Sequence, residues 1–403
     1  MLPLFYVISH YSNLPFRAWE QRELGELGEV TTGKAFSSTS FDNQGEYLVI
    51  TNKNISDSSR SQNIITNRIS ISDDEIIQRY RLDGENILVT MDGVNLGKTA
   101  MYSNANALLA QRVGRIKSNQ LEFIYQITSS NTFLRTMQTL SVGNAIKHIS
   151  LKQISEYSSL GPKDIIERKK IGSFFKKLDN TIALHQRKLD ALKLMKKGFL
   201  QQMFPKRGEN IPKIRLDDFD DIWEERILGE FLKESKIKGS NGSLAKKLTV
   251  KLWRKGVVPK EEIYTGSSAT QYYIRKTGQF IYGKLDFLNQ AFGIIPLELD
   301  GYESTLDSPA FDIEESINET FLLEYVSLVR FYKYQGNIAN GSRRAKRIHT
   351  DTFFEMPIPL PNSNEQQKIG TFSQQIDDLI ALQQNKLEKI SSLKRFYLKN
   401  MFI

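Results

Sequence analysis

The sequence predicts two mixed α/β (α+β) domains in tandem, joined by two long helices that form an antiparallel coiled coil. The first observation is an internal repeat, because residues 171–204 align with residues 369–402 at an offset of 198, with 14 of 34 positions identical. A second repeat lies upstream, where WEQRELGE at 19–26 matches WEERILGE at 223–230. The blocks between the repeats, 28–160 and 232–355, show no comparable identity. A repeat of this kind fixes the order of the architecture as variable block, helix, variable block, helix.

Both helices have start and stop signals. The first is expected to begin near Asp164 and to end before Pro205, and the second is expected to begin after Pro361, with Asn362 or Ser363 as its cap. Apolar residues recur in each at alternating spacings of four and three, which is typical of a coiled coil. The first seam is Ile171, Phe175, Leu178, Ile182, His185, Leu189, Leu192, Lys196, Phe199 and Met203, and the second is Ile369, Ser373, Ile376, Ile380, Gln383, Leu387, Ile390, Lys394, Tyr397 and Met401.

The polar residues in the two seams occupy the same places, His185 with Gln383 and Lys196 with Lys394. The simplest interpretation is that the helices pair with each other. A pseudo-dyad perpendicular to such a pair makes the pair antiparallel. The alternative is two independent amphipathic helices, each docked on its own domain.

The predicted domains are 1–160, an N-terminal domain; 161–213, the first repeat helix and a polar connector; 214–360, a C-terminal domain; and 361–403, the second repeat helix. Strands are expected at 46–50, 86–90, 272–274, 280–282 and 292–297, most of them with Gly, Asp or Asn nearby.

Composition narrows the class of partner. The 403 residues have a net charge of +9 and a pI near 9.3, which favours a polyanion, nucleic acid before membrane. The absence of Cys excludes disulfides and Cys-based zinc sites. The sequence contains only four His residues, so no metal site is expected. Without a run of about 20 apolar residues or a signal peptide, the sequence predicts a soluble cytoplasmic protein.

Motifs for chemistry are missing. The stretch DGVNLGKT at 92–99 is one residue too short for a phosphate-binding loop, and no nucleophile elbow, zinc-protease motif or adenine-methylase motif is found. Cations beside glycines are the remaining signal: Lys34, Lys98, Arg112, Arg115 and Lys147 in the first block, and nine Lys or Arg between 233 and 260 in the second. The sequence predicts no catalytic residue and no metal ligand, and its candidate DNA-binding residues are Lys34, Lys98, Lys147, Lys284, Arg343, Arg344 and Lys346.

Taken together and in their order along the sequence, the motifs of this chain resemble those of the specificity subunit of type I restriction–modification systems, and the resemblance covers nearly the whole chain. The resemblance rests on the two WExRxLGE segments, on PIPLPNSNEQQKI at 357–369, on GENILVT at 84–90, on GVNLGK at 93–98, on YGKLDFLNQAFGIIP at 282–296 and on the repeated helices. Two departures are visible. Arg168 replaces a Gln that follows Glu in the family, and the stretch before Trp19 lacks a counterpart of PKIRLDDF at 212–219.

The resemblance implies a DNA-reading subunit with two target-recognition domains and an asymmetric bipartite target. It also implies two modification subunits that methylate adenine N6, and restriction subunits that translocate and cut. No cofactor is then expected on this chain, whereas S-adenosylmethionine, ATP and Mg are expected on the partners. The alternatives are a coiled-coil scaffold with two protein-binding domains, and an enzyme in its own right.

Overall fold

The computed structural model describes residues 19–55, 66–143, 147–217, 219–261, 267–338, 341–342 and 345–401. The chain divides into two compact units. Unit 1 comprises Met1–His185 with Leu387–Ile403, and unit 2 comprises Gln186–Lys386. Both long helices contribute to both units. Among the described residues, none of the helices is long and apolar enough to cross a membrane.

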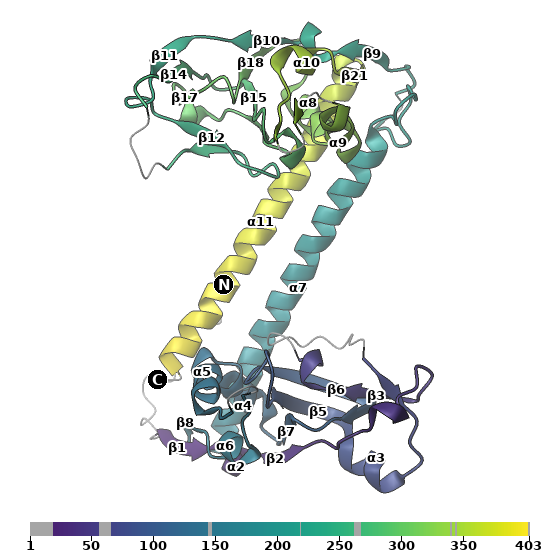
Figure 1. Cartoon of the computed structure of the whole chain (residues 1–403), viewed down its shortest axis with the longest axis vertical. Coiled ribbons are helices and arrows are strands. Elements are labelled where there is room, and N and C mark those ends of the chain that lie inside the picture. Colours follow the sequence, from purple (N-terminus) through teal and green to yellow (C-terminus); the bar gives the residue numbers. More distant parts are fainter. Residues whose placement is uncertain are drawn as a thin grey trace. The chain divides into compact units, whose positions relative to one another are not determined.

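Unit 1 is built on a six-stranded sheet in the order β2-β7-β5-β6-β3-β4 (Figure 1). Its strands are β2 (Glu29–Thr32), β3 (Tyr47–Ile50), β4 (Arg68–Ile69), β5 (Arg81–Thr90), β6 (Thr99–Leu109) and β7 (Val113–Lys117). Its shorter helices are α2 (Leu24–Leu27), α3 (Asp74–Tyr80), α4 (Leu121–Thr128), α5 (Asn131–Leu140) and α6 (Leu151–Ser155), and a separate pair joins β1 (Trp19–Glu23) to β8 (Ser158–Pro162). The expected strands at 46–50 and 86–90 are confirmed within these bounds.

Unit 2 contains a four-stranded sheet in the order β10-β18-β15-β16. These strands are β10 (Leu232–Ser235), β15 (Phe280–Tyr282), β16 (Phe292–Ile294) and β18 (Ala310–Ile313). Smaller sheets are formed by β11 (Lys238–Asn241), β14 (Gln271–Ile274) and β17 (Glu303–Ser304), by β12 (Leu248–Val250) with β13 (Val257–Pro259), by β19 (Gly341–Ser342) with β20 (Ala345–Lys346), and by β9 (Glu224–Ile227) with β21 (Pro357–Leu360). The helices are α8 (Glu319–Val326), α9 (Val329–Ile338) and α10 (Thr350–Phe354). The expected strands at 272–274 and 280–282 are confirmed, whereas the run 292–297 stops at Ile294 and a 3₁₀ turn follows at Leu297–Leu299.

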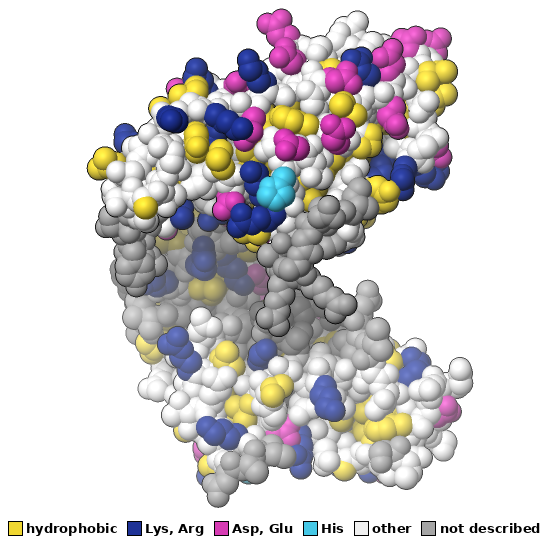
Figure 2. All heavy atoms as spheres, turned by 45° about the horizontal axis from the view of Figure 1, so that its top comes forward, with side chains coloured by type: hydrophobic (Ala, Val, Ile, Leu, Met, Phe, Trp, Pro, Cys, Tyr) yellow, Lys and Arg dark blue, Asp and Glu magenta, His cyan; other side chains and the backbone are white. Residues whose placement is uncertain are grey.

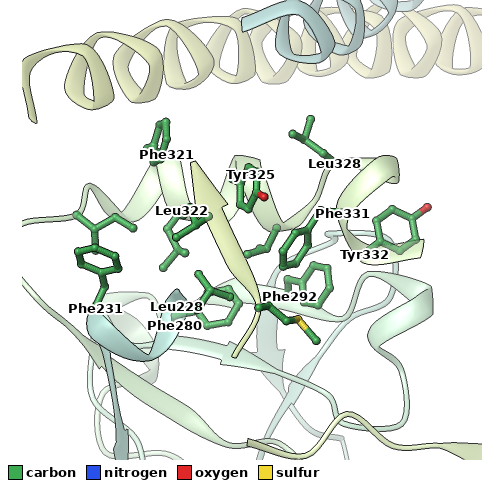
Figure 3. Close-up of a cluster of buried hydrophobic side chains, with 14 of the residues drawn as sticks. Leu228, Phe231, Phe280, Phe292, Phe321, Leu322, Tyr325, Leu328, Phe331 and Tyr332 are labelled. Atoms are coloured by element: carbon green, nitrogen blue, oxygen red, sulfur yellow. The ribbon is translucent and has the colours of Figure 1, made fainter. Parts of the chain in front are cut away.

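Aromatic side chains fill the core of unit 2. Figure 3 shows Phe280 and Phe292 of the sheet beside Phe321, Leu322 and Tyr325 of α8. All five are buried. Burial of a side chain of this size contributes about 1.5–3 kcal/mol, so this cluster stabilises the attachment of α8 to the sheet.

The two units have the same core fold, although their variable blocks show no comparable sequence identity. Each contains four neighbouring antiparallel strands in equivalent order, β2-β7-β5-β6 within the six-stranded sheet of unit 1 and β10-β18-β15-β16 in unit 2. In each, two helices follow that core along the chain, a short helix comes next, and a two-stranded pair leads into a long helix. The duplication predicted from the repeats therefore extends through the variable blocks.

The long helices α7 (Ile165–Met203) and α11 (Ser363–Met401) confirm the predicted bounds. Asp164 accepts a hydrogen bond from the Ile166 amide at 2.9 Å, and Asn362 accepts one from the Glu365 amide at 3.0 Å. Both helices therefore begin at side-chain caps, which satisfy otherwise unpaired amides of the first turn.

In each unit α7 and α11 run in opposite directions. In unit 1 the Phe174 and Tyr397 rings are 5.3 Å apart and Lys394 lies 2.5 Å from Asp179; in unit 2 the Phe199 and Phe372 rings are 5.6 Å apart and Lys196 lies 2.6 Å from Asp377. The residues of each contact in one unit differ by 198 in number from the residues of the corresponding contact in the other unit, so the contacts are equivalent. The antiparallel pairing predicted from the seams is therefore confirmed in each unit, and the supercoil itself stays a prediction.

The repeated glycines in the two helices allow a close approach to each domain. A Cβ on Gly172 would lie 2.6 Å from the Phe123 backbone nitrogen, and a Cβ on Gly370 would lie 2.6 Å from the Asn318 side-chain oxygen. Phe123 belongs to α4, and Asn318 caps α8. These equivalent contacts explain why glycine occurs at this position in both repeats.

The departure at Arg168 has a structural explanation. Its Nη1 donates to the Lys163 carbonyl at 2.9 Å and its Nε to the Gln120 side chain at 2.5 Å. At the equivalent place in unit 2, Gln366 donates to the Pro361 carbonyl at 3.0 Å and accepts from the backbone of Asn318 at 2.9 Å. Arg168 therefore contacts the equivalents of both residues that Gln366 contacts, although its second bond is donated to a side chain and that of Gln366 is accepted from the backbone.

The other departure concerns Arg215, within the PKIRLDDF stretch. Arg215 Nε donates to Glu365 at 2.8 Å, and Trp223 Nε1 donates to the same buried carboxylate at 3.1 Å. This stretch therefore ties the segment around Trp223 to α11. The residues that precede Trp19 lie outside the described part of the chain.

Candidate nucleic-acid interface

The Gly-rich stretch 91–98 is the turn of the β5–β6 hairpin. The Gly97 amide donates to the Thr90 carbonyl at 2.9 Å, and both Gly93 (φ 73°) and Gly97 (φ 81°) occupy the left-handed region that glycine favours. A phosphate-binding loop connects a strand to a helix, whereas this turn connects two strands, so the rejection of that motif is confirmed. Val94 at its tip is 99% exposed, so the turn presents a side chain outward.

Four further segments converge on this turn. Asp92, which is buried, accepts hydrogen bonds from Asn52 and, at 2.8 Å, from Arg112, and its backbone bridges to His148. The segment of Lys34 joins the same edge, since its amide donates to Leu109 at 3.0 Å and its carbonyl accepts from Gln111 at 2.8 Å.

The predicted residues of unit 1 therefore belong to one loop cluster. Lys147 precedes His148 and is exposed, whereas Lys34 and Lys98 are half-buried. Lys34, Lys98 and Lys147 come from three separate loops. The bonds around Asp92 and those of the Lys34 backbone to Leu109 and Gln111 bring these loops to one edge of the sheet. No contact with DNA is tested by this arrangement, so their role stays a prediction.

Unit 2 presents a loop cluster with the same backbone connections. In unit 1 the Met91 amide donates to the Arg112 carbonyl at 3.0 Å and the Met91 carbonyl accepts from Ile149 at 2.9 Å; in unit 2 the Lys284 amide donates to the Asp307 carbonyl at 2.8 Å and the Lys284 carbonyl accepts from Ile348 at 3.0 Å. Lys284 thus occupies the place of Met91. Counting back two residues from Ile149 and Ile348 makes Lys147 and Lys346 equivalent positions.

Lys284 lies among charged side chains. Burial lowers its pKa; the charges of Glu234 and Asp307 oppose this shift, and those of Lys236 and Arg347 add to it. Arg347 and Asp307 form an ion pair at 2.9 Å. A phosphate near Lys284 would favour the charged form of its amine.

Cation counts along the sequence overstate the interface. Arg115, expected near a loop, is 7% exposed in β7, where its Nε donates to Thr31 at 3.1 Å and burial lowers its pKa. In the 233–260 segment, Lys247 is buried and Arg254 is paired with the buried Glu324. Arg115 and Lys247 are thus buried within the fold, and Arg254 is held by a buried carboxylate.

The segment GSRRAKRIH at 341–349, which is dense in basic residues and contains Arg343, Arg344 and Lys346, is described only in part. Arg343 and Arg344 lie outside the described residues. Lys346 is placed through its backbone, because β20 pairs with β19 across Gly341 and Lys346. The binding of DNA by these three residues therefore stays a prediction.

Two cavities in the described residues lie away from these clusters. One of 560 Å³ in unit 2 is lined by four carboxylates, Asp312, Glu314, Glu315 and Glu319, together with the start of α11. One of 380 Å³ lies at the corresponding place in unit 1, between α4 and α7. The carboxylates of the larger cavity would repel a phosphate backbone. Within the described part of the chain, no group of three His, Asp or Glu residues could hold a metal.

The chain thus has two units of one fold, each with a cation-bearing loop cluster and each attached to the same antiparallel helix pair. Lys and Arg side chains lie on the exposed surface of both units (Figure 2). Together with a net charge of +9, these features favour the class of two-domain nucleic-acid-binding proteins.

Comparison with known proteins identifies the family. The family model for the type I restriction modification DNA specificity domain matches residues 17–194 and 220–392, so the chain belongs to this family and carries its domain twice. Two relatives from Methanocaldococcus jannaschii are each 23% identical over 94% of this chain. They are the type I restriction enzyme MjaVIII specificity subunit, covered over 90% of its length, and the putative type I restriction enzyme MjaX specificity subunit, covered over 91%.

Solved structures share the fold. The type I restriction–modification S subunit from M. genitalium matches with a TM-score of 0.64 and 12% identity, over 97% of this chain and 98% of its own. A chain from a structure on complex assembly and conformational transition of the type I R-M system matches with a TM-score of 0.51 and 15% identity over the same shares. The resemblance drawn from the sequence motifs is therefore confirmed at the level of family and fold.

Proposed function

We propose that this chain is the non-catalytic DNA-reading subunit of a type I restriction–modification complex, and that it recognises an asymmetric bipartite target. Unit 1 reads one half-site and unit 2 reads the other. The major groove is the expected place of readout, because it distinguishes all four base pairs.

The observation that carries this proposal is the pair of corresponding loop clusters on one shared core. Equivalent backbone hydrogen bonds hold both clusters, but the side chains differ, as Met91 and Lys284 illustrate. A common frame with different side chains supports two similar modes of docking with two different base preferences. An asymmetric target follows from that difference.

The helix pair supports a role as spacer and as attachment for partners. Helix α7 has 39 residues and is about 58 Å long at 1.5 Å per residue, so half-sites separated by unspecified base pairs fit its length. Because the offset of 198 relates the helix contacts of the two units, the helices offer two similar surfaces, one for each of two modification subunits. Those subunits would bind S-adenosylmethionine and methylate adenine N6, and the restriction subunits would use ATP and Mg.

Methylome sequencing of a host with and without this gene tests the proposal. Loss of the gene should remove one bipartite N6-methyladenine motif while the modification subunits are still expressed. An unchanged adenine methylome would refute it. If the chain were instead a protein-binding scaffold, bipartite-site DNA would not be retarded in a gel by the chain, with or without modification subunits.

A further inference from the structure

A tryptophan stands at the tip of the β12–β13 hairpin in unit 2. The two strands pair from Leu248 with Pro259 to Val250 with Val257, and residues 251–256 form the connection. Trp253 in this connection is 55% exposed, whereas Trp223 of the same unit is 1% exposed. An indole offers a large apolar surface and is normally buried, so its exposure in a hairpin tip needs an explanation.

The backbone of this tip is held in a conformation that the residues do not favour. Trp253 (φ 60°) and Arg254 (φ 55°) are both in the left-handed region, which is uncommon for bulky residues. The Trp253 amide donates to the Asn289 carbonyl at 2.8 Å, and the Arg254 amide donates to the Gln290 carbonyl at 3.1 Å. Strain of this kind is often found at functional sites, where the surrounding structure maintains it.

Arg254 anchors the tip to the rest of unit 2. Its guanidinium donates to Glu324 of α8, with Nη2 at 3.0 Å from Oε1, and Lys196 of α7 lies 2.9 Å from the same oxygen. Glu324 is buried. The indole is therefore presented by a turn whose position is fixed through α8 and α7.

The charge around the indole favours a polyanion as its partner. Lys251 and Lys255 flank Trp253 with exposed side chains, and residues 235–260 contain no Asp or Glu. Asn289 and Gln290, which hold the tip, belong to the same β15–β16 connection as Lys284. The tip is thus physically joined to the loop cluster proposed to face DNA.

We propose that Trp253 packs its indole directly against duplex DNA bound by unit 2, while Lys251 and Lys255 contact the flanking phosphates. The proposal rests on the function proposed above and adds a contact to it. Apolar side chains can contact sugars and base edges or wedge between base steps, and a preformed tip loses little conformational freedom on binding.

The test uses the full chain assembled with its modification subunits and a duplex that carries the motif found by methylome sequencing. Trp253→Gly is the informative variant, because glycine adopts the observed φ readily and only the indole is lost. Trp253→Phe should retain part of the contact. The matched control is Leu244→Ala, since Leu244 is 74% exposed in the turn that precedes the hairpin.

DNA affinity should fall about tenfold for Trp253→Gly, which is about 1.4 kcal/mol, and it should be unchanged for Leu244→Ala. A duplex substituted with 5-iodouracil within the second half-site should crosslink to the peptide that contains Trp253. Unchanged affinity together with an absent crosslink overturns the contact and leaves the proposed function standing. Reduced binding of modification subunits with normal DNA affinity of the assembled complex also overturns it. If the parent complex fails to bind the motif, the proposed function fails as well.

Discussion

Removal of the Glu324 carboxylate should strongly destabilise unit 2. Glu324 lies on α8 and is 2% exposed. It accepts from Lys196 of α7 at 2.9 Å and from Ser373 of α11 at 2.6 Å, and it is paired with Arg254. One carboxylate therefore ties both long helices and the β12–β13 tip to the core of the unit.

The magnitude follows from the pKa. Burial alone would raise the pKa of Glu324, but the charges of Arg254 and Lys196 and the hydrogen bonds from Arg254 and Ser373 outweigh it, and they lower the pKa from 4.5 to about 2. A depression of this size corresponds to about 3 kcal/mol of stability at neutral pH. The same size is expected from breaking a buried ion pair, which costs about 3–5 kcal/mol.

The pH dependence has a definite sign. Because the folded-state pKa is depressed, the contribution of Glu324 is complete above its unfolded pKa near 4.5 and is lost as the pH falls through about 2. The difference in the free energy of unfolding between the parent chain and Glu324→Gln should therefore be about 3 kcal/mol at pH 7. It should shrink progressively below about pH 4.5.

Urea unfolding followed by the fluorescence of the buried Trp223 provides the assay, in a background where Trp19 and Trp253 are replaced by Phe. Glu315→Gln is the matched control, since Glu315 is an exposed carboxylate just before α8. A loss below about 1 kcal/mol for Glu324→Gln, or a difference that does not change between pH 7 and pH 3, would refute the reasoning.

Three other outcomes are expected. Gly172→Ala should destabilise the chain by about 1–3 kcal/mol, because the added Cβ would lie 2.6 Å from a backbone atom. Gly198→Ala should stabilise α7 by up to about 1 kcal/mol, because the space around Gly198 is open. Thermal unfolding of both variants measures these effects, and equal effects would contradict the close approach at Gly172. Lys147→Ala should weaken binding to all DNA sequences alike and reduce the salt slope by about one, and an unchanged slope in a salt titration would remove Lys147 from the interface. Insertion of seven residues after Leu184 and of seven after Leu387 preserves the heptad and lengthens both helices by about 10 Å. The methylome should then show both half-sites separated by a gap that is longer by about three base pairs. A changed half-site would contradict the spacer role.

The helices could be predicted from the sequence because their signals are local or repeated. Asn362 as a cap, the seam spacing and the offset of 198 each survive in the structure. The partners of Lys196 and Lys394 were not predictable individually, since Asp377 and Asp179 lie on the other helix. The structure was needed to show that these two ion pairs occupy equivalent positions, 198 residues apart, in the two repeats.

The shared core of the variable blocks could not be predicted, because it rests on backbone hydrogen bonds that place no demand on side-chain identity. Met91 and Lys284 make the same two bonds with unrelated side chains. Counting cations along the chain also misjudged Arg115 and Arg254 as available to DNA. Whether a cation is exposed or paired depends on residues far away in sequence, such as Thr31 and Glu324.

Exchange of one recognition block tests the central claim most directly. Residues 232–355, from the start of β10 to the residue after α10, would be replaced by the corresponding block of a family member with a different target, and the adenine methylome would then be sequenced. Our account predicts that one half-site changes to that of the donor, while the other half-site and the gap are retained. A change in both half-sites, or in neither, would contradict the assignment of one half-site to each unit.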